Sequence, residues 1–234
     1  MQLTFSLESL AQTDALGHAL ALLLEAGDCL ALHGDLGAGK TTLVRAIART
    51  MGVDQALVSS PTFVIVNEYP LAPSDPPSSN TAQTATTLVH VDAYRLTSTE
   101  DLDALGWDQL DDGSSVLLIE WAQRIADALD PRRTADLHLT ILDEDSRAVA
   151  LTLPDTWQDR AGLAQLRAIA STSANTTAER TATTCPVTGQ PVPADSPTWP
   201  FVSEQARMAD LYKWFSGQHN ISRPVDQTDL EEEV

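Results

Sequence analysis

Eight consecutive residues, Gly34 to Thr41, combine glycines, a lysine and a hydroxyl at a spacing that suits phosphate binding. Their order fits the pattern G-x4-G-K-[ST], in which glycines let successive backbone N–H groups point at one anion. The lysine reaches the outer phosphates, and the threonine hydroxyl can ligate Mg²⁺. The pattern therefore predicts a P-loop nucleotide site formed by Gly34, Asp35, Leu36, Gly37, Ala38, Gly39, Lys40 and Thr41.

A carboxylate ends a continuous apolar run further along the chain. Residues 116–119 are Val-Leu-Leu-Ile, and Glu120 follows them directly. Such a run is typical of a buried parallel strand, and ligand sites in α/β proteins lie at the carboxyl ends of these strands. We predict that Glu120 is a magnesium ligand rather than a solvated residue at a strand end. Trp121, beside it, either contacts the nucleotide or covers the core.

A second carboxylate, Asp92, lies near the end of another strand-like segment. It shares one face of that strand with His90, because side chains two residues apart point the same way. Asp92 could position the attacking water or complete the magnesium shell, whereas His90 is interpreted as a packed, hydrogen-bonded histidine. Arg95 could contact phosphate or form a surface ion pair. The predicted catalytic residues are Lys40, Asp92 and Glu120.

A short segment between the P-loop helix and the next strand reads Ser60-Pro61-Thr62. A threonine hydroxyl in such a segment can sense the outermost phosphate, as switch loops do. We predict a switch role for Ser60, Pro61 and Thr62, although the same residues also suit an ordinary turn that enters a strand.

The surrounding pattern predicts the elements that position these residues. An apolar strand at 29–33 precedes the glycine loop, and an amphipathic helix at 40–51 follows it. Thr13 is expected to N-cap an earlier helix that runs to Glu25. Further strands are expected at 2–7, 62–68, 88–94 and 116–120, with a hairpin of 137–141 and 149–153. The fold class is α/β: a P-loop NTPase-like mixed sheet flanked by helices, with a small irregular or helical C-terminal extension.

Composition and charge narrow the classes of function. The 234 residues include 14 basic and 33 acidic side chains, for a net charge of −19, and the lysines are Lys40 and Lys213. Direct nucleic-acid binders rely on Lys and Arg, so any link to RNA is expected to run through a partner protein. No apolar run is long enough to span a membrane. A secretory signal requires basic residues near its start, and none precedes Lys40. We expect a cytoplasmic protein with no membrane partner.

Taken in order, these stretches resemble the TsaE (YjeE) family, the ATPase of bacterial tRNA threonylcarbamoyladenosine synthesis. The resemblance covers residues 1 to about 153, and its motifs are 34–42, 60–63, 90–96, Asp101-Leu102, Leu105-Gly106 and 119–121. It implies ATP and Mg²⁺ as ligands, with Thr41 and Glu120 on the metal. It also implies that Asp92 is needed for hydrolysis and that Thr42 and Trp121 lie beside the nucleotide.

The same resemblance implies partners. Family members work with TsaB and TsaD, which transfer a threonylcarbamoyl group to adenosine 37 of tRNA, and the ATPase supports turnover of that complex. We therefore expect TsaB- and TsaD-like partners, with tRNA contacted indirectly through the complex. The segment 71–87 is rich in Pro, Ser and Thr and longer than the family's usual connection, so we expect a surface loop there.

The remaining third of the chain has a different composition. A degenerate segment resembles the small YacG zinc ribbons, whose cysteines would fall at 185, 188, 202 and 206. Thr188, Val202 and Ala206 replace three of these cysteines, and tetrahedral zinc needs four N or S ligands, so we predict no zinc. A helix is expected at 203–216. The predicted divisions are an ATPase domain (1–153), a helix and linker (154–183), the YacG-like segment (184–220) and an acidic disordered tail (221–234).

Two other functions are compatible with a P-loop. A small-molecule or nucleoside kinase would need a lid with several arginines, and Arg132 and Arg133 are the only basic pair, which disfavours that interpretation. A nucleotide-binding module without turnover would have no need of both predicted acidic partners. The combination of Lys40, Asp92 and Glu120 therefore favours ATP hydrolysis.

Overall fold

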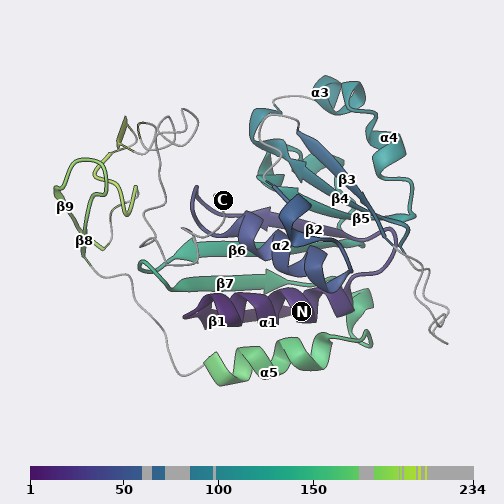
Figure 1. Cartoon of the computed structure of the whole chain (residues 1–234), viewed down its shortest axis with the longest axis horizontal. Coiled ribbons are helices and arrows are strands. Elements are labelled where there is room, and N and C mark those ends of the chain that lie inside the picture. The colour runs from purple at the N-terminus through teal and green to yellow at the C-terminus, as the bar shows by residue number, and fades with distance from the viewer. Residues whose placement is uncertain are drawn as a thin grey trace, which may run out of the picture. The chain divides into compact units, whose positions relative to one another are not determined.

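Seven strands form one mixed sheet, with the P-loop strand at its centre (Figure 1). Across the sheet they are β1 (Gln2–Leu7), β7 (Arg147–Thr152), β6 (Thr134–Ile141), β2 (Cys29–His33), β5 (Ser115–Glu120), β4 (Thr87–Asp92) and β3 (Val66–Pro70). β6, β2, β5 and β4 are parallel neighbours, whereas β1, β7 and β3 join the sheet through antiparallel pairs. The predicted α/β class with a mixed sheet is confirmed.

This computed structural model describes residues 1–59, 65–71, 85–96, 99–173, 182–194, 196, 198–203, 205–206 and 209. They belong to two compact units, Met1–Glu179 and Arg180–Val234. In the second unit, β8 (Thr183–Thr184) pairs antiparallel with β9 (Pro191–Val192). Most of the predicted helix at 203–216 and all of the predicted tail lie outside the described residues. No helix within the described ranges has the length and hydrophobicity needed to cross a bilayer.

Helices cover both faces of the sheet. The described α-helices are α1 (Leu10–Leu23), α2 (Lys40–Thr50), α3 (Thr99–Ala104), α4 (Trp107–Leu110) and α5 (Leu163–Ser173). Single 3₁₀ turns are η1 (Gln55–Leu57), η2 (Ala93–Arg95), η3 (Ala122–Arg124), η4 (Ala126–Ala128) and η5 (Asp155–Trp157). Because side chains alternate along a strand, each buried strand supplies two hydrophobic clusters, one on each face.

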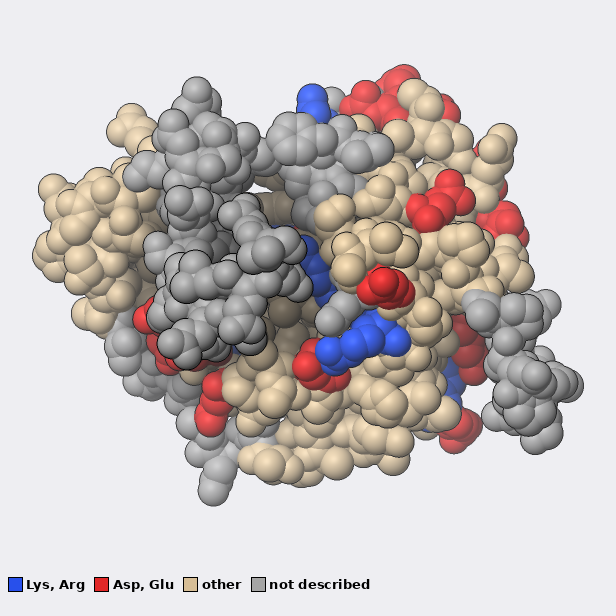
Figure 2. Space-filling model, viewed as in Figure 1, with Lys and Arg blue, Asp and Glu red and all other residues tan. Residues whose placement is uncertain are grey.

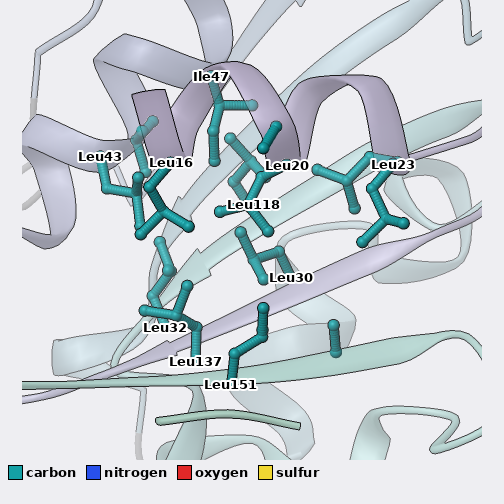
Figure 3. Close-up of a cluster of buried hydrophobic side chains, with 14 of the residues drawn as sticks. Leu16, Leu20, Leu23, Leu30, Leu32, Leu43, Ile47, Leu118, Leu137 and Leu151 are labelled. Atoms are coloured by element: carbon teal, nitrogen blue, oxygen red, sulfur yellow. The ribbon is translucent and has the colours of Figure 1, made fainter. Parts of the chain in front are cut away.

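The larger cluster fixes α2, and therefore the P-loop, over the centre of the sheet. Figure 3 shows leucines of α1 and α2 packed on leucines that point up from the strands. Each fully buried leucine contributes about 1.5–3 kcal/mol relative to an exposed one. The members that Figure 3 labels are Leu16, Leu20, Leu23, Leu30, Leu32, Leu43, Ile47, Leu118, Leu137 and Leu151. On the opposite face, Val89, Val91 and Ile119 pack with α3, α4 and η3.

The first helix begins earlier than the sequence pattern predicts. Ser9, in extended conformation, accepts the N–H of Gln12 and caps α1, which ends at Leu23 rather than at Glu25. The prediction of Thr13 as N-cap was therefore wrong. Both residues have hydroxyl side chains that suit a cap, but the Thr13 hydroxyl instead donates to the carbonyl of Ser9 from within the first turn.

The contact between α1 and α2 depends on a glycine. A Cβ atom at Gly17 would lie 2.4 Å from Cβ of Ala46, so the two helices touch without room for a side chain. We expect Gly17→Val to lower the free energy of unfolding by about 1–3 kcal/mol, because α1 must move away from α2. Urea unfolding checks this against Ala15→Val, which introduces the same valine side chain at an exposed position of α1. Equal midpoints for the two variants would contradict the expectation.

Candidate functional site

The P-loop leaves the carboxyl end of β2 and enters α2 at the centre of the sheet. Its first residue, Gly34, has a φ of +137°, and a Cβ atom there would lie 2.4 Å from the carbonyl oxygen of Leu139. Gly39 precedes α2 in the left-handed conformation, with a φ of 101°. The N-terminus of α2, whose N–H groups attract anions, therefore opens directly from the glycine loop.

Lys40 lies folded into this loop and is almost completely buried. Its Nζ donates to the carbonyl oxygens of Gly34, at 2.8 Å, and of Asp35, at 3.0 Å. The same Nζ lies 4.1 Å from the centre of the Trp121 ring, within the range of a cation–π contact. Burial lowers the pKa of Lys40, whereas the charges of Glu120, Asp92 and Asp35 raise it. The predicted lysine and both predicted carboxylates thus belong to one electrostatic site.

Glu120 connects the P-loop helix to the sheet. The Thr41 hydroxyl donates to Glu120 Oε1 at 2.7 Å, and His90 Nε2 lies 2.9 Å from the same oxygen. Glu120 ends β5, Thr41 begins α2 and His90 lies on β4, so three elements meet at this carboxylate. Because the Thr41 hydroxyl donates its hydrogen bond to Glu120, the lone pairs of its oxygen stay available to a cation.

The donor set around Thr41 fits Mg²⁺. The nearby ligands are a hydroxyl and carboxylates, the hard oxygen donors that Mg²⁺ prefers. Among the residues that the structure describes, no group of three or more His, Cys, Asp or Glu side chains could hold a metal ion. Mg²⁺ is commonly bound through one or two carboxylates together with substrate phosphates and water, so a site with few protein ligands is compatible with this ion. The predicted absence of zinc stays a prediction.

Asp92 lies beside Glu120 at the same edge of the sheet. The two are register partners on β4 and β5, and Asp92 is 4% exposed. β4 ends here, two residues before the end of the predicted strand 88–94. It ends because Asp92 Oδ1 accepts the N–H of Tyr94 at 3.0 Å and so caps the turn η2. The cap fixes the carboxylate at the carboxyl end of its strand, where α/β ligand sites lie.

Trp121 has an unusual backbone conformation for a large residue. Its φ of 60° is left-handed, and its N–H donates to the carbonyl of Leu32 at 3.0 Å. This conformation turns the ring over Lys40 Nζ, with the Tyr94 ring 5.1 Å away. Strained conformations of this kind persist only where the surrounding structure holds them, and they cluster at functional sites. Trp121 therefore stands next to the expected phosphate position, while its contact with nucleotide stays a prediction.

A cavity of about 620 Å³ adjoins the glycine loop on the side of α1. Its wall includes 37–39 and Thr42 from the loop and α2, together with 9–11 from the start of α1. Arg147, from the strand after the β6–β7 turn, also lines it and donates Nε–H to the carbonyl of Ala38 at 3.2 Å. Sequence reasoning missed Arg147, because 109 residues separate it from Ala38 and only its place beside a hairpin turn marks it.

The predicted switch residues Ser60, Pro61 and Thr62 lie outside the described residues, as does most of the predicted loop 71–87. Of the other predicted site residues, Lys40, Thr41, Asp92, Glu120 and Trp121 are brought together. Thr42 faces the adjoining cavity instead.

Two histidines stack on each other beside the start of the P-loop, where His33 directly precedes Gly34. The rings of His33 and His138 are 4.2 Å apart, and His33 Nε2 lies 2.9 Å from Asp136 Oδ1. Although His138 is exposed, partial desolvation of its ring, and then the charge of His33, lowers its pKa from the ordinary 6.5, and Asp136 opposes the shift. The unfolded chain therefore binds this proton at a higher pH than the folded chain does.

The sign of this shift gives a pH prediction. Stability that depends on neutral His138 is fully present above about pH 6.5 and is lost as the pH falls through the lower folded-state pKa. We expect the melting temperature of His138→Gln to fall less than that of wild type between pH 7.5 and pH 5.5. Parallel melting curves at the two pH values measure the difference. An identical fall in both proteins would contradict the assignment.

A family model and curated relatives indicate the same family. A family model described as threonylcarbamoyl adenosine biosynthesis protein TsaE matches residues 7–149. A Streptomyces coelicolor protein named tRNA threonylcarbamoyladenosine biosynthesis protein TsaE is 43% identical over 115 residues, which are 46% of this chain and 66% of that protein. A Bacillus subtilis protein of the same name is 33% identical over 141 residues, covering 60% and 79% of the two chains. The crystal structure of Bacillus subtilis YdiB aligns with a TM-score of 0.49 and 26% identity, over 75% of this chain and 95% of that one.

Proposed function

Because the chain belongs to the TsaE family, whose model matches residues 7–149, we propose that it is a magnesium-dependent ATPase. We further propose that it assists the complex that adds a threonylcarbamoyl group to adenosine 37 of tRNA. The observation that carries the ATPase proposal is the 2.7 Å hydrogen bond between Thr41 and Glu120 beside a buried lysine. That hydrogen bond holds a hydroxyl and a carboxylate together at the N-terminus of α2, where backbone N–H groups can bind an anion.

The loop and its adjoining cavity support ATP as the ligand. Lys40 Nζ donates hydrogen bonds to two loop carbonyls, and phosphate oxygens would replace those carbonyls as acceptors. Leu10, 73% exposed at the cavity wall, offers an apolar surface on which a base can rest. A cavity of about 620 Å³ lies in the size range of small-molecule sites.

Thr41, Glu120 and Asp92 have separate roles in the proposed reaction. Thr41 and Glu120 would hold Mg²⁺, which supplies charge neutralisation at the phosphate oxygens when it is bound. Asp92 would orient the attacking water and accept its proton, since its carboxylate is held at the strand end beside Glu120. Lys40 would stabilise the charge that develops on the transferred phosphoryl group.

Charge supports an indirect link to tRNA. Figure 2 shows Asp and Glu gathered over α3 and α4, at the upper right, with Lys and Arg at scattered points of this face. Exposed members of that acidic region include Glu100, Asp103 and Asp108. A surface of this sign repels phosphate, so we propose that TsaB- and TsaD-like partners, rather than this chain, contact the tRNA. The tRNA pathway makes the cytoplasm the expected compartment.

The geometry does not favour the kinase alternative. Arg132 pairs with Asp130, and Arg133 pairs with Asp111 and the carbonyl of Gly27. Both arginines lie beside the amino end of β2, where Cys29 N–H donates to the carbonyl of Arg133. The P-loop leaves the opposite end of that strand, so this basic pair does not supply a lid over the phosphates.

Calorimetric titration with ATP and a hydrolysis assay test the proposal. We expect binding in the presence of Mg²⁺, slow release of phosphate, and faster release when the TsaB- and TsaD-like proteins of the same cell are added. Absence of binding and hydrolysis under all these conditions would refute the ATPase. Binding and hydrolysis that the partner proteins leave unchanged would refute the proposed link to tRNA modification. Phosphate transfer to a small acceptor would favour the kinase.

A further inference from the structure

His90 is a buried polar side chain within an apolar part of the sheet. It is 0% exposed, its register partner on β5 is Leu118, and Leu88 precedes it on the same face of β4. A polar group in such surroundings is unfavourable unless it is hydrogen-bonded, and an apolar residue would avoid that cost. Packing alone therefore gives no reason for an imidazole at this position.

Within the described residues, the His90 side chain has one hydrogen-bond contact, with Glu120. Nε2 lies 2.9 Å from Glu120 Oε1, whereas Nδ1 has no hydrogen-bond partner among the residues that the structure describes. A carboxylate oxygen only accepts, so the ring hydrogen that serves this contact is on Nε2. The contact with Glu120 is therefore what compensates for the burial of this imidazole.

Two donors from different elements hold the same oxygen of Glu120. Thr41 approaches Oε1 from α2 and His90 approaches it from β4, which fixes the rotation of the carboxylate group. Within the described part of the chain no hydrogen bond to Oε2 is found. This arrangement holds the carboxylate through Oε1 and leaves Oε2 without a hydrogen bond from the described residues.

We propose that His90 is a positioning residue that holds Glu120 in the orientation required for Mg²⁺, an inference that rests on the proposed function. His90 does not touch the substrate or the metal itself. It supplies a fixed donor to Oε1, so the carboxylate would keep its orientation when the Thr41 oxygen coordinates the ion. Groups that orient a metal ligand in this way typically change metal affinity about 10–100-fold when they are removed.

The magnesium dependence of nucleotide binding tests the inference. The probe is AMP-PNP, a non-hydrolysable ATP analogue, titrated at a series of Mg²⁺ concentrations. We expect His90→Leu, which has similar bulk and no donor, to raise the half-saturating Mg²⁺ concentration about tenfold. His90→Gln restores an N–H donor and should recover most of that loss. AMP-PNP binding in EDTA should be equal in all these proteins.

A matched control separates this role from general destabilisation. Val89→Ala truncates a buried side chain on the other face of β4, away from Glu120. An unchanged Mg²⁺ requirement in His90→Leu, or an equal rise in Val89→Ala, would overturn the inference while leaving the ATPase proposal intact. Failure of wild type to bind AMP-PNP would instead refute the proposed function, and this inference with it.

A measurement on the nucleotide-free protein does not depend on activity or on variants that fold. Nitrogen-15 NMR of the imidazole distinguishes which ring nitrogen carries the hydrogen. We expect His90 in wild type to carry it on Nε2, as the contact with Glu120 requires. A hydrogen on Nδ1, with a bare Nε2 facing the carboxylate, would overturn the proposed contact.

Discussion

Replacing Lys40 with alanine is expected to lower the rate of ATP hydrolysis at least about 10²–10³-fold, the usual effect of removing a preorganised donor from a charged site, and to weaken ATP binding. The effect is large because Lys40 lies at the centre of the site: its Nζ is within hydrogen-bonding distance of two loop carbonyls and over the Trp121 ring. Burial keeps water away from this charge, so its attraction to phosphate is screened less than at the surface.

Lys213 provides the control for charge. Lys213→Ala removes the same charge at the chain's other lysine, and it should leave ATP hydrolysis within about twofold of wild type, because Lys213 is not part of the motif Gly34 to Thr41. Lys40→Arg keeps the charge but presents a planar fork in place of a compact ammonium, so we expect it to resemble Lys40→Ala. Substantial hydrolysis by Lys40→Ala, measured by phosphate release, would remove Lys40 from the proposed mechanism.

The sequence was sufficient for the parts of the site that depend on local pattern. Gly34 to Thr41 could be assigned because a glycine loop between an apolar strand and an amphipathic helix depends on neighbouring residues only. Glu120 could be placed at a strand end because residues 116–119 leave no polar position for an exposed face. The register of β4 with β5 then brought Asp92 beside it, as parallel strands with aligned ends must.

The remaining features depend on contacts between distant parts of the chain. His90 was interpreted as a packed, hydrogen-bonded histidine, but pattern alone could not show that its partner is Glu120, 30 residues away. Arg147 reaches the loop only because β6 lies next to β2 in the sheet and β7 pairs with β6. The start of α1 was misplaced because Ser9 and Thr13 are both residue types that can cap a helix, and the extended backbone of Ser9 identifies it as the cap.

Asp92→Asn is expected to lower the rate of ATP hydrolysis about 10²–10⁴-fold, the usual contribution of a general base, with ATP affinity within about threefold of wild type. Asparagine has the same shape and keeps the side-chain oxygen that accepts the N–H of Tyr94, so the turn η2 should survive. What is lost is the negative charge that can orient a water and take its proton. A fall in rate without a fall in binding therefore separates a role in the chemical step from a role in holding nucleotide.

Asp108→Asn is the matched control, since it removes one carboxylate charge from an exposed position on α4. Its hydrolysis rate and its melting temperature should equal those of wild type. If Asp92→Asn instead lost ATP affinity and hydrolysis in the same proportion, its carboxylate would act on bound nucleotide as a whole, through Lys40 or the metal. The ratio of the two losses thus decides whether Asp92 belongs with Glu120 as part of the binding machinery or acts on the water alone.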